Sequence, residues 1–340
     1  MNLRHEGYRL GVFLLWYFFA KGLVWNMLKY GLKKIIRLII VLLGVSILTF
    51  SFTAWIQGNP AEIVLGRSGI DPTVEDVKAL EKEMGIDQSV PVQYVNWMKK
   101  VVVLDFGNSY ITGVPVVEEI GYRLPATMSL TMGAFLIMIV ISVSVGVTAV
   151  VLRKSFISNI IDGITFIFMG IPGFVLGLVL AYIISVKFLL LPMVGNKTPQ
   201  HYILPLLTLA IPMSCRYIRI IKTNLIDVLG EDYIFLLRTK GVRERVILLS
   251  NALKNAFIPV VNLMGISFGS LFGGSIVVEN IFSWPGLGNY LMNSINNRDY
   301  PVILAYVMLM ATVFVFVNYI VDMIVCFLDP RIKFQEGEKR

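Results

Sequence analysis

"EDYIFLLRTKGVRERVILLSNALKNAFIPVV", residues 231–261, places a charged, helix-patterned segment between two long hydrophobic runs. Residues 224–240 carry apolar side chains at helical spacing, namely Leu225, Leu229, Tyr233, Leu236 and Leu237. Gly241 then interrupts the pattern, as a glycine does at a helix stop, and residues 243–255 resume it. We therefore predict two short amphipathic helices joined at Gly241. They would either lie on anionic lipid or dock into another protein, and the pattern alone favours neither.

The composition indicates a membrane protein. The chain has 340 residues, of which 56% are hydrophobic and 15% are charged, whereas soluble domains carry about 25% charged residues. No soluble core of this size hides so much apolar surface, so most of it must face lipid. The net charge of +8 is then explained by basic cytoplasmic loops and not by nucleic acid. The two cysteines, Cys215 and Cys326, lie in or beside apolar runs and suggest no disulfide framework.

Six runs are long enough to cross a bilayer, which takes about 20 apolar residues. They are residues 38–56, 127–151, 159–186, 202–221, 257–279 and 301–327. Several of these runs contain glycine, proline or serine, which is typical of membrane helices packed against one another. The sequence therefore predicts an all-α integral membrane protein with six transmembrane helices.

Basic residues predict the orientation of this bundle. They gather before the first run, between the second and third, between the fourth and fifth, and after the sixth. Short basic loops stay in the cytoplasm, so we expect both termini and the loop 222–256 to face inward. Residues 57–126 would then form an extracellular helical insertion, with one helix over 73–84 capped by Thr73 and a second one after Pro91. We expect this insertion to pack on the span ends, where it could also receive an extracellular partner.

The remaining boundaries follow from these segments. Residues 1–26 are interpreted as an N-terminal extension that is either non-native or a surface helix, and 27–56 as a cytoplasmic lead and the first span. We expect residues 127–330 to form a five-helix core that includes the loop 222–256, and 331–340 to form a cytoplasmic tail.

The chemistry of an enzyme is missing from the sequence. His5 and His201 share no cluster with other metal ligands, and no nucleophile–base pair or G-x-x-x-x-G-K-[ST] phosphate loop occurs. Inside the spans, Asn318 and Asp322 lie four apart and are interpreted as structural. We therefore predict no catalytic residue, no metal site and no cofactor. An intramembrane enzyme is therefore disfavoured, while a stand-alone secondary transporter or channel and an accessory membrane scaffold stay open as functions.

The charged segment resembles the cytoplasmic loop of permease subunits of ABC importers, in the dipeptide/oligopeptide/nickel family. Further blocks resemble family motifs in the same order: "GNPAEIVLG" (58–66), "MGIDQSVPVQYVNWM" (84–98), "LDFGNSYITGVPVVEEI" (104–120), "GIPGFVLGLVLAY" (170–182), "YILPLLTLAIP" (202–212), "VENIFSWPGLGNYL" (278–291), "RDYPVILAYV" (298–307) and "NYIVDMIVCFLDPRI" (318–332). The resemblance covers residues 27 to about 334. It implies the type I ABC importer permease fold.

The resemblance also implies a function and partners. The chain would form half of a translocation pathway for peptides, nickel or a metal chelate. A second homologous permease, two ATPase subunits that hydrolyse ATP, and an extracellular or periplasmic solute-binding protein would complete the transporter. The loop would form a coupling helix whose ATPase-facing residues are Leu236, Leu237, Arg238, Lys240 and Gly241. Two departures stand out: the family usually has small residues where this chain has Leu236 and Leu237, and an aspartate where it has Asn59.

The fifth span combines glycines with the polar residues Asn262, Ser267 and Ser270. A small, polar helix face is expected along a solute pathway, so we predict that these three residues line part of it. Close helix packing requires the same small residues and is the alternative interpretation.

Overall fold

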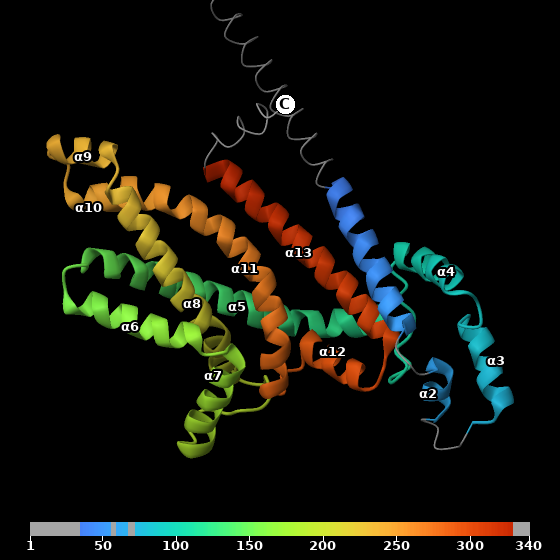
Figure 1. Cartoon of the computed structure of the whole chain (residues 1–340). Coiled ribbons are helices and arrows are strands. Elements are labelled where there is room, and N and C mark those ends of the chain that lie inside the picture. The colour runs from blue at the N-terminus through green and yellow to red at the C-terminus, as the bar shows by residue number, and fades with distance from the viewer. Residues whose placement is uncertain (1–34, 56–58, 67–71, 329–340) are drawn as a thin grey trace, which may run out of the picture.

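The computed structural model describes residues 35–55, 59–66 and 72–328, and Figure 1 shows the arrangement of their helices. The extension 1–26 and the tail 331–340 lie outside the described residues. Within the described part, β structure is limited to one isolated bridge between Asn108 and Pro115. The all-α prediction is confirmed.

The helices follow one another in the order that the hydrophobic runs predict. The first is Ile35–Trp55. It is followed by α2 (Pro60–Gly66), α3 (Val74–Met84), α4 (Val90–Val102), α5 (Val116–Val151), α6 (Phe156–Gly170), α7 (Gly173–Leu180), the π-helix η1 (Ala181–Lys187), α8 (Gln200–Leu229), α9 (Asp232–Thr239), α10 (Glu244–Val246), the π-helix η2 (Ile247–Ala252), α11 (Leu253–Ile281), α12 (Leu287–Asn296) and α13 (Tyr300–Leu328).

Five of the described helices are long and apolar enough to cross a membrane, and a bent pair makes a sixth span. The run 159–186 is not one straight helix in the structure, because α6 and the α7–η1 segment meet at an angle of 101°. The break falls at Ile171, which adopts an extended conformation (φ −87°, ψ 122°) directly before Pro172. A residue before proline is driven out of the helical region by the proline ring, which explains the bend.

The loop 222–256 also differs from the predicted pair of short helices. The helix predicted over 224–240 is interrupted, since α8 ends at Leu229 and α9 starts afresh at Asp232. Between them Glu231 is extended (φ −74°, ψ 151°) and forms the N-cap of α9. The second predicted helix, 243–255, is not short either. It is the first part of one 38-residue helix, Glu244–Ile281, that includes the fifth span.

The predicted helices of the insertion between the first two spans are confirmed. Thr73 caps α3 through a capping box, in which its hydroxyl accepts from the Asp76 N–H and the Asp76 carboxylate accepts from the Thr73 N–H. In α4, Tyr94 and Trp97 pack on Phe50 of the first helix with ring centroids 5.5 Å away in both cases. The insertion therefore rests on the side of the first helix and not only on its end.

The core lies where α5, α8 and α11 meet. Its largest cluster contains Leu130, Leu204, Leu271 and the fully buried Trp284. On the opposite side of α11, Gly265 and Gly269 let α13 approach, because a Cβ atom at either position would overlap with Val321 or Phe314. Figure 1 shows the resulting elongated bundle, with α9 and α10 at one end and α2, α3 and α4 at the other.

Candidate functional site

The short helix α9 is held rigidly between α8 and α10. Its residue Ile234 is fully buried and packs with Leu225 of α8 and Ile247 of η2. The chain reverses direction at Gly230 and Glu231 before α9. It turns again after α9 at Gly241, which has a left-handed backbone conformation (φ 77°). A left-handed residue strains any side chain with a Cβ, which accounts for glycine at this turn.

Two polar contacts close the loop around this apolar centre. The Arg238 Nε donates to the Glu244 Oε1 at 2.7 Å, and the Asn255 amide donates to the Tyr233 hydroxyl at 2.8 Å. The first contact ties α9 to α10, and the second ties α9 to the base of α11. Both contacts therefore connect α9 to the continuous helix Glu244–Ile281.

The structure spreads the predicted ATPase-facing residues over different environments. Leu236, Arg238, Lys240 and Gly241 are exposed, whereas Leu237 is half-buried and packs against the Ile234 cluster. The sequence analysis overlooked Phe235, whose exposed fraction of 65% exceeds the 57% of Leu236. The helical spacing predicted this buried face for Leu225, Leu229, Tyr233 and Leu237, which share one cluster, whereas Leu236 is exposed.

The predicted pathway residues of α11 also divide. Asn262 and Ser270 are exposed, while Ser267 is buried and its hydroxyl lies 2.7 Å from the Tyr217 hydroxyl of α8. Ser267 therefore contributes to the packing of α8 on α11. Of the three predicted pathway residues, only Asn262 and Ser270 are accessible to another molecule.

A buried carboxylate joins α5, α11 and α12, and it was absent from the sequence-based list of sites. Glu279 is completely buried and accepts from the Thr127 hydroxyl at 2.8 Å and from the N–H groups of Gly288 and Asn289 at 2.7 and 3.1 Å. The Thr127 hydroxyl also accepts from the Leu287 N–H at 2.8 Å. An acidic group at a helix N-terminus satisfies otherwise unpaired N–H groups and opposes the helix dipole. We call this group of contacts the Glu279 anchor.

A second buried carboxylate fixes the loop before α5. Asp299, at the start of α13, accepts from the Ser109 hydroxyl at 2.5 Å and from the Tyr110 N–H at 3.0 Å. Burial first, and the neighbouring Asp299 second, raise the pKa of Tyr110 to about 12. The phenol therefore stays neutral at physiological pH.

An ion pair connects the bent third span to α8. The Lys222 ammonium donates to both Asp162 carboxylate oxygens at 2.8 and 2.6 Å and to the Ser158 hydroxyl at 2.9 Å. The sequence analysis assigned Lys222 to the loop and did not consider Asp162. A charged side chain in a span is costly unless it is paired, and this pairing supplies the partner.

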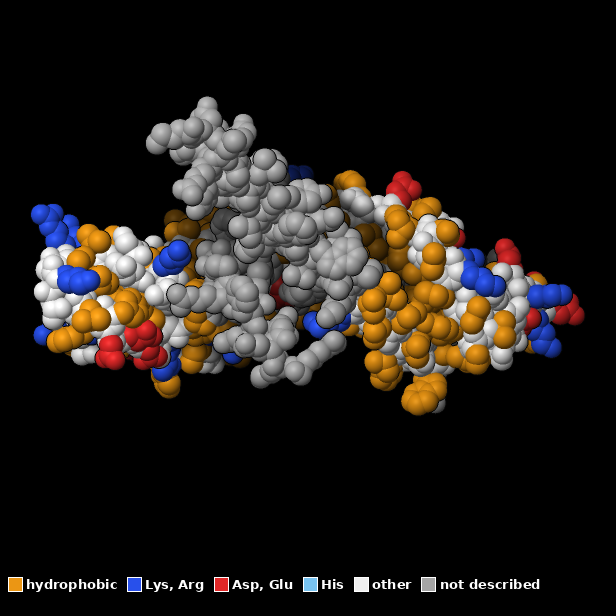
Figure 2. Space-filling model, turned by 90° about the horizontal axis from the view of Figure 1, so that it is seen from above, with side chains coloured by type: hydrophobic (Ala, Val, Ile, Leu, Met, Phe, Trp, Pro, Cys, Tyr) orange, Lys and Arg blue, Asp and Glu red, His pale blue; other side chains and the backbone are white. Residues whose placement is uncertain are grey.

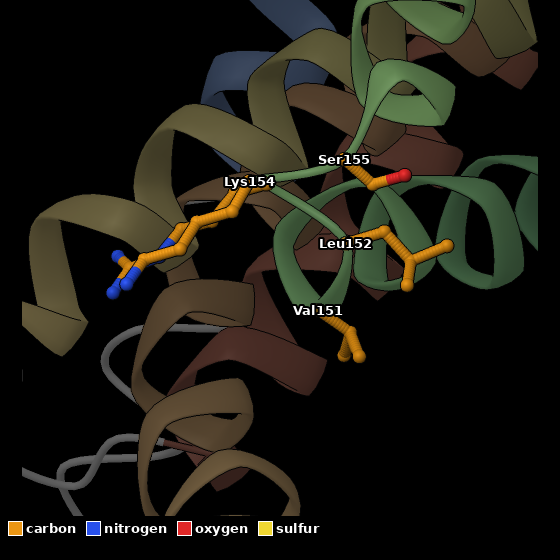
Figure 3. A pocket seen from close by; sticks show the side chains of 5 residues that line it. Val151, Leu152, Lys154 and Ser155 are labelled. Carbon is orange, nitrogen blue, oxygen red and sulfur yellow. The ribbon is translucent and has the colours of Figure 1, made fainter.

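The loop between α5 and α6 forms an open hollow lined by the consecutive residues 151–155. Figure 3 shows the Lys154 side chain pointing to one side, while Val151 and Leu152 point elsewhere. Because a single short loop lines the hollow, no groups from other elements converge on it. Among the described residues, no group of three or more His, Cys, Asp or Glu could hold a metal ion.

Comparison with known proteins identifies the class. Residues 138–334 match the family model "Binding-protein-dependent transport system inner membrane component", and residues 27–131 match the corresponding N-terminal model. The fold resembles a solved structure described as an inward-facing conformation of the MetNI methionine ABC transporter, with a TM-score of 0.52, 20% identity, and 63% of this chain and 97% of that chain covered.

The bundle and its loop thus define a permease subunit of an ABC importer. This chain belongs to the family of binding-protein-dependent transport system inner-membrane components. It is 39% identical over 311 residues to the glutathione transport system permease protein GsiC of Salmonella typhimurium (strain LT2), covering 91% of this chain and all of that protein. The same protein of Escherichia coli (strain K12) is 37% identical over 309 residues, again covering 91% and 100%. The chain is a multi-pass membrane transport subunit and not an enzyme, since ATP hydrolysis belongs to separate subunits.

Removal of the Glu279 anchor should destabilise the permease. In Glu279→Ala the Thr127 hydroxyl and two N–H groups of α12 lose their partner in a buried site. We expect a loss of about 3 kcal/mol of stability, because each unsatisfied buried donor costs about 1–3 kcal/mol. Thermal unfolding of the purified permease measures the effect, with Glu118→Ala at an exposed position of α5 as the control. Equal unfolding temperatures for the two variants would contradict the assigned role.

Proposed function

We propose that this chain forms half of the translocation pathway of an ABC importer and that α9 is its coupling helix. A second homologous permease completes the pathway, two ATPase subunits bind on the α9 side, and a solute-binding protein delivers the cargo. The observation that carries this proposal is the rigid attachment of α9 to the helix Glu244–Ile281. Movement of α9 by the ATPase subunits would tilt that helix and change access to the pathway.

The chemistry of α9 supports a protein partner. Phe235 and Leu236 form an exposed apolar tip, and Arg238 and Lys240 lie beside it. Such a surface fits an apolar groove with acidic residues on its rim. Leu236 is exposed at a position where the family usually has a small residue, so this groove would be wider than the family's usual one. Leu237 supports the site from within and does not enter the groove.

The proposed orientation places both termini and α9 in the cytoplasm. The loop with Arg153 and Lys154, and the loop with Arg238, Lys240, Arg243 and Arg245, lie at the same end of the molecule (Figure 1). Basic loops at one end are what the positive-inside rule requires. The insertion 57–126 then lies on the outer side.

The cargo is proposed to be a small peptide or a peptide-like solute. The support is the similarity to glutathione permeases over nearly the whole chain. Nickel and metal chelates are the alternatives within the wider family. The exposed Asn262 and Ser270 of α11 are proposed to line the route.

The cargo proposal is tested by uptake. In cells that express the complete transporter, uptake of labelled glutathione or a tripeptide should saturate and should be inhibited by other short peptides. An excess of nickel, alone or chelated by histidine, should leave it unchanged. Transport of nickel with no peptide uptake would reverse the assignment.

The coupling proposal is tested at Gly241. In Gly241→Val a β-branched side chain is forced into a left-handed conformation, which costs about 1–2 kcal/mol and displaces the turn after α9. We expect transport and co-purification of the ATPase subunits to fall several-fold, while membrane insertion stays normal. Gly85→Val is the matched control, since Gly85 is also left-handed (φ 70°), has open space around it, and lies in the insertion. An equal loss of ATPase binding in both variants would show that backbone strain alone is responsible.

The pathway proposal is tested by cysteine accessibility. In a background with Cys215→Ala and Cys326→Ala, Ser270→Cys should react with a water-soluble thiol reagent in at least one nucleotide state. Ser267→Cys should stay protected, because position 267 is buried against Tyr217. Protection of position 270 in every state would assign the exposed face of α11 to packing.

A further inference from the structure

The exposed face of α8 is polar, although α8 is long and apolar enough to cross a membrane. The exposed residues in the C-terminal half of this helix are Arg216, Arg219, Thr223, Ile226 and Asp227. Elsewhere the exposed side chains of the spans are mainly large and apolar, as at Leu48 of the first helix, Ile160 of α6 and Phe316 of α13. Figure 2 likewise shows hydrophobic side chains over much of the surface in view. The exposed face of α8 therefore differs from the faces that suit lipid.

Two arginines dominate this face. Arg216 and Arg219 are three residues apart, so they lie on neighbouring turns of one side of the helix. Both are exposed, and no ion pair joins either of them to another of the described residues. Lys222, one turn further on, already has its partner in Asp162. A guanidinium beside hydrocarbon is costly, and the charged residues of a span face a water-filled cavity or a partner. The two arginines therefore call for an anionic group from outside the described part of this chain.

The helix α11 packs against α8 and runs in the opposite direction. The Tyr217 hydroxyl of α8 lies 2.7 Å from the Ser267 hydroxyl of α11. Earlier in α8, the Leu209 side chain lies beside Gly274, where a Cβ atom would be 3.7 Å from it. Since Leu209 precedes Tyr217 but Gly274 follows Ser267, the order of the contacts is reversed between the two helices. The helices are therefore antiparallel.

The exposed polar faces of α8 and α11 lie on the same side of this helix pair. A helix turns by about 100° per residue, so Arg216 is rotated by about 100° from Tyr217. Ser270 is rotated by about 60° from Ser267, in the same sense along its own chain. In antiparallel helices, rotations of the same sense away from a shared contact lead to the same side of the pair. Arg216 and Ser270, which are both exposed, thus border one surface.

We propose that Arg216 and Arg219 bind the carboxylate of the cargo as it passes through the permease, with Ser270 on the neighbouring helix. This proposal rests on the proposed function and deepens it, because it assigns the part of the cargo that the permease itself recognises. A guanidinium is planar and always charged, and its fork of N–H donors matches a carboxylate. The serine hydroxyl adds a hydrogen-bonding group without an opposing charge. An unblocked peptide carries a terminal carboxylate, so it has the group that this surface fits.

Charged thiol reagents test the attraction of an anion without any transport. The complete transporter, with Cys215→Ala and Cys326→Ala in the background, carries Thr223→Cys on the exposed face of α8 and is placed in nanodiscs. Reaction with a thiosulfonate that bears a sulfonate is compared with reaction with one that bears a trimethylammonium group. We expect the anionic-to-cationic rate ratio to fall several-fold when Arg216→Gln and Arg219→Gln are added.

Arg153→Gln is the matched control, since Arg153 is exposed in the loop between α5 and α6, and it should leave the ratio unchanged. A ratio that is the same with and without Arg216 and Arg219 would overturn the proposal. So would the absence of reaction with either reagent at position 223, because lipid or another subunit would then cover this face.

Uptake tests the carboxylate itself. The complete transporter and its solute-binding protein are reconstituted in proteoliposomes, and a labelled tripeptide with a free C-terminal carboxylate is compared with its C-terminal amide. Because the solute-binding protein is the same throughout, a change in the acid-to-amide ratio of kcat/KM reports on the permease. We expect Arg216→Gln to lower this ratio several-fold, and Arg216→Lys, which keeps the charge but not the fork, to lower it less.

Equal losses for the acid and the amide in Arg216→Gln would overturn the proposal, since the arginine would then serve the fold or pair with the second permease. An unchanged acid-to-amide ratio would overturn it as well. If the unaltered transporter imports neither peptide, the proposed cargo is wrong, and the rate ratio at position 223 alone decides whether the two arginines attract an anion.

Discussion

The Glu279 carboxylate is the interaction on which the packing of α5, α11 and α12 depends. It accepts hydrogen bonds from α5 and from two backbone N–H groups of α12, while it belongs to the end of α11. Where backbone groups have no water, each of them needs an internal partner. A single side chain fills this need for three elements at once. The tight turn through Gly286 and Gly288 leaves room for it, because a Cβ atom at either glycine would overlap with the carboxylate.

The proposed coupling helix α9 lies at the opposite end of the bundle from the Glu279 anchor (Figure 1). The helix Glu244–Ile281 runs unbroken from the base of α9 to the Glu279 anchor. Near its inner end it contains the π-helical turn η2, and such turns inside α-helices occur often at functional sites. The helix Glu244–Ile281 therefore connects the proposed coupling helix with the exposed Asn262 and Ser270. The Lys222–Asp162 ion pair links the bent third span to α8.

The first helix, α4 and the loop before α5 form a second, more loosely attached part. Its contacts with the core are few and specific, with Ser109 and Tyr110 held by the buried Asp299. A helix that scarcely packs on its own chain needs lipid or another subunit around it. The exposed apolar surface of the first helix is therefore what a membrane span requires.

The sequence alone determined the class of the protein, the number and order of its spans, and the helices of the insertion. These features are local: the length of an apolar run sets a span, and Thr73 with Asp76 sets a helix start. The tertiary structure decided the rest. Glu279 and Thr127 are 152 residues apart, so no local pattern announces their contact. The exposure of Phe235 and the burial of Ser267 depend on which helices pack alongside. The bend before Pro172 lies within one continuous apolar run. Periodicity predicts which residues share a face only while the helix is unbroken, and long-range packing decides which way that face points.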